Sequence, residues 1–151
     1  MLASIRPDSI NFALLVHVLG AMVMVGALVT AVAAALVGWR DDTGSLRRLS
    51  YKTLLYAALP GYIVMRVGAE WVYAKEHLDD LPDDPAWVVI GYITSDLGGL
   101  LLLVALILGG IGLRRSRSGG GGGLLKTSSV IATLLVAAYI VAIWAMGAKP
   151  T

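Results

Sequence analysis

The chain has 151 residues, of which 58% are hydrophobic and 15% are charged, and its mean hydropathy is +0.80. A soluble domain is normally about 45–50% apolar and about 25% charged, and at roughly 150 residues it still exposes about 30% of its unfolded surface. The composition therefore excludes a soluble domain and predicts an integral membrane protein with about four spans. The net charge of +2 is small, and the absence of cysteine excludes disulfides and thiolate metal sites.

Four apolar segments are predicted to cross the membrane as helices. The first covers about residues 10–38, too long for the apolar region of a cleaved signal peptide. The second covers about 53–74, and Pro60-Gly61 inside it predicts a kink. The third and fourth cover about 86–113 and 127–148. Because the connections are short, we expect one all-α domain over residues 1–151, an antiparallel up-down four-helix transmembrane bundle.

Positive charge gathers in the loops after the first and third spans. Cytoplasmic loops carry an excess of Lys and Arg, so both loops are expected in the cytoplasm, with N-out and C-out termini. The loop between the second and third spans is acidic and is expected to be solvated on the outer side. Eight of the 12 basic residues lie in the two basic loops: Arg40, Arg47, Arg48, Lys52, Arg114, Arg115, Arg117 and Lys126.

Five consecutive glycines, Gly119–Gly123, follow the third span. A phosphate-binding loop would need a Gly-Lys-Ser/Thr ending and a preceding strand, and this run has neither. The composition is typical of a flexible linker, so a flexible cytoplasmic loop is expected here.

Four ionisable residues fall inside the predicted spans. Counting 1.5 Å per residue from the outer ends, His17 lies about 12 Å deep, Arg66 and Asp96 about 13 Å, and Glu70 about 7 Å. Tyr139 in the fourth span reaches a similar depth. All of them are therefore expected in the outer half of the membrane.

The spacing of these residues predicts that they meet. Tyr62, Arg66 and Glu70 are four residues apart in turn and share one helix face. Tyr92 and Asp96 are also four apart. An intramembrane charge costs at least about 2.5–3.5 kcal/mol at a helix centre without a partner. We therefore expect one inward-facing cluster, with Arg66 bonded to Asp96 across helices and to Glu70 along its own helix, and with the Thr94 and Ser95 hydroxyls turned away.

Two interpretations of this cluster remain open. It is either an ion-pair clamp that fixes helix register, or a site that binds a ligand or takes up a proton. One arginine facing two carboxylates leaves a charge of −1, which a proton on His17 or on one carboxylate would balance. The residues of the candidate site are His17, Arg66, Glu70, Asp96, Tyr62, Tyr92 and Tyr139.

His17 also has the chemistry of an axial haem ligand or a metal ligand. Ligation of haem by two histidines would need a second one at matching depth, and His77 lies just beyond the second span. Haem is thus the cofactor considered for this site, the metal is unknown, and no catalytic residue is predicted.

Three segments carry a resemblance to known families. The run Leu14-Leu-Val-His17-Val-Leu-Gly20-Ala-Met-Val-Met-Val-Gly26 resembles the opening helix of copper-resistance CopD-like proteins and DUF2269-type integral membrane proteins. Pro60-Gly61-Tyr-Ile-Val-Met-Arg66-Val-Gly-Ala-Glu70-Trp71 and Gly91-Tyr-Ile-Thr-Ser-Asp96-Leu-Gly-Gly99 look like an uncharacterised bacterial four-span family. The CopD-like resemblance implies copper transport, with His17 the matching residue.

The sequence therefore predicts a small, non-enzymatic membrane protein, either an accessory subunit or a ligand-binding bundle. The alternatives are a redox protein that binds haem or quinone, and a carrier of a cation such as copper or of protons. The rich use of Ala, Gly, Val and Arg suits a bacterium with a GC-rich genome and hence its cytoplasmic membrane. The expected partners are the lipid bilayer and other membrane subunits or a second copy, but not nucleic acid.

Overall fold

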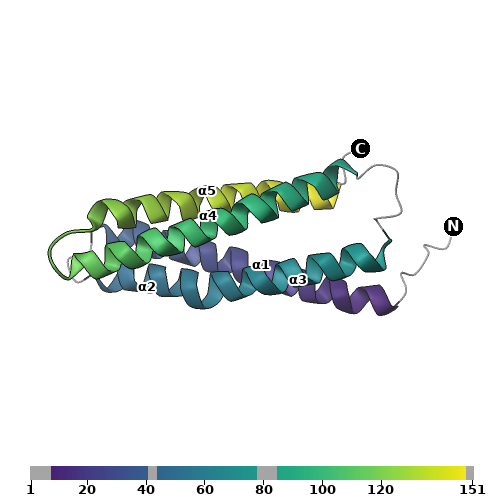
Figure 1. Cartoon of the computed structure of the whole chain (residues 1–151), viewed down its shortest axis with the longest axis horizontal. Helices are drawn as coiled ribbons and strands as arrows, with labels where there is room; N and C mark the ends of the chain where they lie inside the picture. Colours follow the sequence, from purple (N-terminus) through teal and green to yellow (C-terminus); the bar gives the residue numbers. More distant parts are fainter. Residues whose placement is uncertain (1–7, 41–43, 78–84, 149–151) are drawn as a thin grey trace.

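Long helices packed side by side make up the protein, as its computed structural model shows (Figure 1). The structure describes residues 8–40, 44–77 and 85–148, and every element within them is a helix, which confirms the all-α class. Residues 78–84, most of the predicted acidic loop, lie outside the described part. The elements are α1 (Asp8–Gly38), α2 (Ser45–Thr53), the π-helical turn η1 (Leu54–Ala58), α3 (Leu59–Lys75), α4 (Ala86–Ser116) and α5 (Gly122–Ala148).

Three of the described helices are long and apolar enough to cross a membrane. They are Ile10–Gly38 of α1, Ala86–Ser116 of α4 and Gly122–Ala148 of α5. The second predicted span differs, because its helix begins at Ser45 rather than near residue 53 and is divided by η1. Its last part, α3, has only 17 residues. The structure therefore shows three candidate membrane-spanning helices where the sequence predicts four.

The interruption expected at Pro60 takes the form of the π-helical turn. Proline has no N–H group, and its ring crowds the carbonyl four residues earlier, here that of Tyr56. Tyr56 lies inside η1, where the wider π-helical hydrogen bonding changes the register of the carbonyls. The helix then continues through Pro60 at the start of α3.

The glycine run contributes to two helix ends and does not form a linker along its whole length. α4 ends at Ser116, and the amide of Gly120 donates to the carbonyl of Arg115 over 3.1 Å, while Gly119 has a φ of 81°. This is the arrangement in which a left-handed glycine closes a helix. α5 then begins at Gly122, five residues earlier than predicted.

α1 and α3 form an antiparallel hairpin with their backbones in close contact. A Cβ added at Gly61 would lie 2.7 Å from the backbone nitrogen of Met24, and one at Gly68 would lie 2.5 Å from the backbone nitrogen of His17. Gly20 of α1 faces the backbone of Met65 between them. Glycine at these positions lets the two helices approach, which is the usual role of small residues in membrane helices.

α4 and α5 form a second antiparallel hairpin. The Ser128 hydroxyl of α5 donates to the carbonyl of Ala105 of α4 over 2.7 Å. Nearer the other end, a Cβ added at Gly98 would lie 2.5 Å from the Tyr139 hydroxyl oxygen. The small residues of α4 thus provide space for larger side chains of α5.

The two hairpins share a core around the middle of α1 and α5. Its largest fully buried side chains come from both hairpins: Met24, Leu28, Leu54, Leu102 and Leu135. Toward the end where α1 begins and α5 ends, the α1–α3 and α4–α5 pairs separate (Figure 1). The candidate site lies between them there.

Candidate functional site

A cavity of about 270 Å³ lies between the two hairpins, with walls from α1, α3, α4 and α5. Most of its wall is apolar, including Met24, Met65, Val88, Ile143 and Met146. Trp87 contributes an aromatic side chain at the beginning of α4. The polar side chains that line it are His17, Arg66, Tyr73, Glu76, Tyr92, Ser95 and Tyr139.

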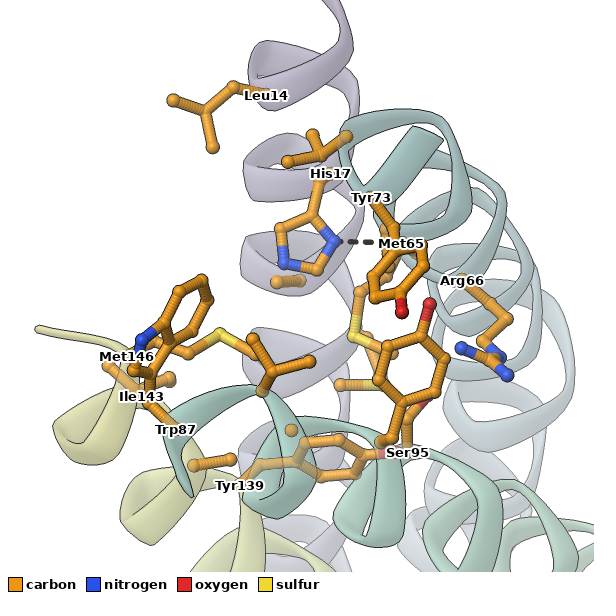
Figure 2. Close-up of a pocket in the computed structure, with 18 of the residues that line it drawn as sticks. Leu14, His17, Met65, Arg66, Tyr73, Trp87, Ser95, Tyr139, Ile143 and Met146 are labelled. Atoms are coloured by element: carbon orange, nitrogen blue, oxygen red, sulfur yellow. Dashed lines mark hydrogen bonds between the residues drawn. The ribbon is translucent and has the colours of Figure 1, made fainter. Parts of the chain in front are cut away.

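His17 presents one ring nitrogen to this cavity. Its Nδ1 lies 2.9 Å from the backbone oxygen of Met65. A carbonyl oxygen only accepts, so Nδ1 carries the hydrogen and the neutral ring has its lone pair on Nε2. Figure 2 shows Nε2 on the side of the ring away from Met65, toward the open space between the hairpins. The contact with Met65 therefore fixes both the orientation and the tautomer of His17.

Two hydroxyls of the cavity wall are buried and have no hydrogen-bond partner among the described residues. Tyr139 is 5% exposed and Ser95 is 7% exposed, and neither the Tyr139 hydroxyl nor Ser95 Oγ is bonded. Each such group costs about 1–3 kcal/mol relative to a satisfied one. The Tyr139 hydroxyl lies against Gly98, one helical turn after Ser95 on the buried face of α4. The sequence predicts Ser95 on a face turned away from the inward-facing cluster. That expectation is wrong, because Ser95 lies on the buried face of α4.

Arg66 makes both ion pairs that the spacing predicts. Its Nη1 lies 2.7 Å from Glu70 Oε1, and its Nη2 lies 3.0 Å from Asp96 Oδ1. The side chain of Arg66 is 26% exposed, but those of Glu70 and Asp96 are 53% and 63% exposed. Neither carboxylate lines the cavity. The cluster thus lies on the outer surface of the α3–α4 contact, which corrects the expectation that it faces inward.

Two predicted tyrosines join α3 to α4 beside this cluster. The Tyr62 hydroxyl donates to the Ser95 carbonyl over 3.2 Å. The Tyr92 hydroxyl donates to Glu70 Oε2 over 3.2 Å, and the Arg66 guanidinium lies 4.7 Å from the centre of the Tyr92 ring. These contacts fix how α3 and α4 pack next to the cavity.

The predicted site residues therefore divide into two groups. His17 and Tyr139 line the cavity, and so does Ser95, which was not predicted as a site residue. Arg66, Glu70, Asp96 and Tyr92 form what we call the α3–α4 ion-pair cluster, of which Arg66 and Tyr92 also line the cavity. Tyr62 connects the two groups through its bond to the Ser95 backbone.

The cavity does not fit a haem group held by two histidines. His77 lies in the turn that follows α3, with a φ of 51°, and is not among the lining residues. A volume of about 270 Å³ is below the range of roughly 300–1,000 Å³ usual for drug-sized ligands, so it is too small for a macrocycle. Within residues 8–40, 44–77 and 85–148, no three His, Asp or Glu side chains form a group that could hold a metal ion.

The cavity has the chemistry of a binding site. It combines apolar walls with a hydrogen-bond acceptor on His17, and two of its wall residues, Tyr139 and Ser95, carry unbonded hydroxyls that are buried behind the wall. Few polar groups among many apolar ones are typical of small-molecule sites. No protein-family model, curated protein or solved structure matches this chain.

Proposed function

We propose that this protein is a small, non-enzymatic membrane protein that binds a small, largely apolar ligand between its two hairpins. The observation that carries the proposal is the pair of buried, unbonded hydroxyls of Tyr139 and Ser95 in the cavity wall. A ligand that bonds to them would remove the cost of leaving them unsatisfied. The apolar wall would hold the rest of the ligand, and the His17 ring would add orientation.

The proposed location is the cytoplasmic membrane of a bacterium, with all four long helical segments crossing it. The three apolar helices support a membrane location, and the exposed apolar side chains of α3, such as Ile63 and Val67, support a fourth crossing. α1 and α4 both end at one end of the bundle, where the basic residues lie (Figure 1). The residues that line the cavity, such as Leu14, Trp87 and Met146, lie toward the other end. With N-out and C-out termini, the cavity would lie in the outer half of the membrane.

A role as an accessory subunit is the second proposal, and the α3–α4 ion-pair cluster supports it. More than half of the Glu70 and Asp96 side chains is exposed on the outside of the bundle. Charged groups are costly in contact with lipid tails. Another membrane subunit or a second copy that covers this surface would remove that contact.

Thermal unfolding of the purified protein with a panel of small amphiphiles tests the binding proposal. A ligand at 100 times its Kd stabilises a protein by about 2.7 kcal/mol, so a compound that binds should raise the Tm. Ala142→Leu fills space in the cavity wall and should abolish the increase. Ala138→Leu, on the exposed side of the same helix, is the matched control and should keep it. A panel that leaves the Tm unchanged, or an increase that survives Ala142→Leu, would contradict the proposal.

A further inference from the structure

Resting on the proposed function, we infer that the ligand is a quinol, a neutral ring that carries hydroxyl groups and an apolar tail. One hydroxyl of the quinol donates to Nε2 of His17. An oxygen of the same ring accepts from the Tyr139 hydroxyl. The inference follows from the hydrogen-bonding capacity, the charge and the size of the cavity.

The first step concerns the acceptor. Because Nδ1 of His17 donates to the Met65 carbonyl, the neutral ring offers only an acceptor at Nε2. A ligand that bonds there must bring an O–H or N–H group. A quinol has such a group, whereas the oxidised quinone has only carbonyl oxygens and would place an acceptor against an acceptor.

The second step concerns the donors. Ser95 and Tyr139 each have a hydroxyl that can donate, and neither is bonded to a described residue. Both belong to the buried faces of their helices, α4 and α5, across the cavity from α1, which carries His17. Both oxygens are covered in the free protein, so a ligand oxygen that accepts from one of them needs a small shift of the cavity wall, while the acceptor toward α1 is already in place. A ring with oxygens on opposite sides offers both a donor toward α1 and an acceptor toward α4 and α5.

The third step concerns charge. Among the described cationic residues, Arg66 is the one that lines the cavity, and its two terminal nitrogens are already paired with Glu70 and Asp96. A carboxylate or phosphate group would therefore meet a guanidinium whose charge two carboxylates already balance, and the Glu76 carboxylate, which also lines the cavity, would repel it. The groups that are unbonded, on Ser95 and Tyr139, are neutral. A neutral ligand fits this arrangement better than an anionic lipid.

The fourth step concerns shape. A volume of about 270 Å³ suits one or two rings. Met65 and Met146 are among its lining residues, and methionine adapts to flat rings and makes favourable contacts with them. The hairpins diverge at this end of the bundle (Figure 1), and we assign the apolar tail to the apolar part of the cavity wall, which includes Leu14, Val88 and Ile143.

Binding of decylubiquinol and decylubiquinone, which share one tail, tests the inference. The protein is placed in lipid nanodiscs without oxygen, and Kd is measured from the Tm increase and from tryptophan quenching, with Trp87 in the cavity wall. Empty nanodiscs correct for partitioning into lipid. We expect the quinol to bind about tenfold more tightly than the quinone, the difference typical of one hydrogen bond to a preformed site.

Two variants assign the preference to named atoms. His17→Asn keeps an N–H group near the Met65 carbonyl but removes Nε2, so the preference for quinol should disappear. Tyr139→Phe removes only the buried hydroxyl and should weaken binding of both forms severalfold. Tyr56→Phe is the control, because Tyr56 is 72% exposed and does not line the cavity, and it should bind like wild type.

The outcomes separate the two proposals. Equal or tighter binding of the quinone, or a preference that persists in His17→Asn, overturns the quinol assignment. Should His17→Asn fail to fold, unchanged binding by Tyr139→Phe overturns it by itself. If neither form binds but another amphiphile of the panel raises the Tm, the quinol assignment fails and the proposed function stands. If no compound raises the Tm, both fail.

Discussion

Gly68 and His17 pack backbone against backbone, because a Cβ atom added at Gly68 would lie only 2.5 Å from the backbone nitrogen of His17. This approach brings α1 close enough to α3 for His17 Nδ1 to bond to the Met65 carbonyl, which lies on the same side of α3 one turn earlier. The bond in turn directs Nε2 into the cavity. A glycine therefore sets the direction of the imidazole in the proposed site.

We expect Gly68→Ala to separate α1 from α3 and to destabilise the protein by about 1–3 kcal/mol, the usual cost of overpacking, because the obstacle is backbone that cannot rotate away. Ligand binding should weaken as well, since His17 moves with α1. The measurement is the Tm in detergent. Gly26→Ala is the control, since a Cβ there meets nothing within 4 Å, and it should keep the Tm or raise it. Equal Tm values for the two variants would contradict the close packing.

The α3–α4 ion-pair cluster should show energetic coupling. Arg66→Leu leaves Glu70 and Asp96 without their cation and should lower stability by about 2–3 kcal/mol, near the cost of an unpaired charge in a membrane helix. Asp96→Leu should cost less, because Arg66 keeps Glu70. The double variant should be more stable than the sum of the two losses predicts, by about 0.5–3 kcal/mol. Unfolding of all four proteins measures this, and strictly additive losses would show that the 3.0 Å pair contributes nothing.

The ion pairs of Arg66 were predictable from sequence because charge and helical spacing leave few other arrangements. The face was not. Asp96 and Ser95 are adjacent, so they point about 100° apart, and only one can face the cavity. If a charge inside the membrane must be buried, Asp96 is expected to face the cavity. In the structure Arg66 reaches Asp96 on the outside instead, and Ser95 takes the inner face.

A signal for the true face was nevertheless present in the sequence. Small residues follow one face of α4 at steps of three, four or seven positions, and the members of this row are buried: Gly91, Ser95, Gly98, Ala105, Gly109 and Gly112. In a membrane helix such a row marks the face that packs against other helices. Ser95 belongs to this row and Asp96 does not. The volume of the cavity, by contrast, depends on how far two hairpins diverge, which no local pattern specifies.

Backbone conformation explains why the turn between α4 and α5 contains glycine. Gly121 has a φ of 86°, and a Cβ there would lie 2.9 Å from the Cβ of Arg115. We expect Gly121→Ala to destabilise the protein by about 1–2 kcal/mol, the cost of a left-handed conformation for a residue with a side chain. Gly122→Ala is the control one residue later, where a Cβ meets nothing within 4 Å. A Tm unaffected by Gly121→Ala would show that the turn between α4 and α5 tolerates other conformations.

The absence of cysteine allows a direct test of topology. We expect Ala148→Cys, at the end of α5, to react with a membrane-impermeant maleimide on intact spheroplasts. Ser118→Cys, beside the arginines that follow α4, should react only after permeabilisation. Both positions are exposed, so reactivity reports the side of the membrane and not burial. The physical reason is the preference of basic loops for the cytoplasm, from which we expect the Arg114–Arg117 end inside and the cavity end outside. The reverse pattern would place the cavity, and any ligand that enters it, in the cytoplasmic half of the membrane. Reaction of both cysteines from outside would mean that α5 does not cross the bilayer.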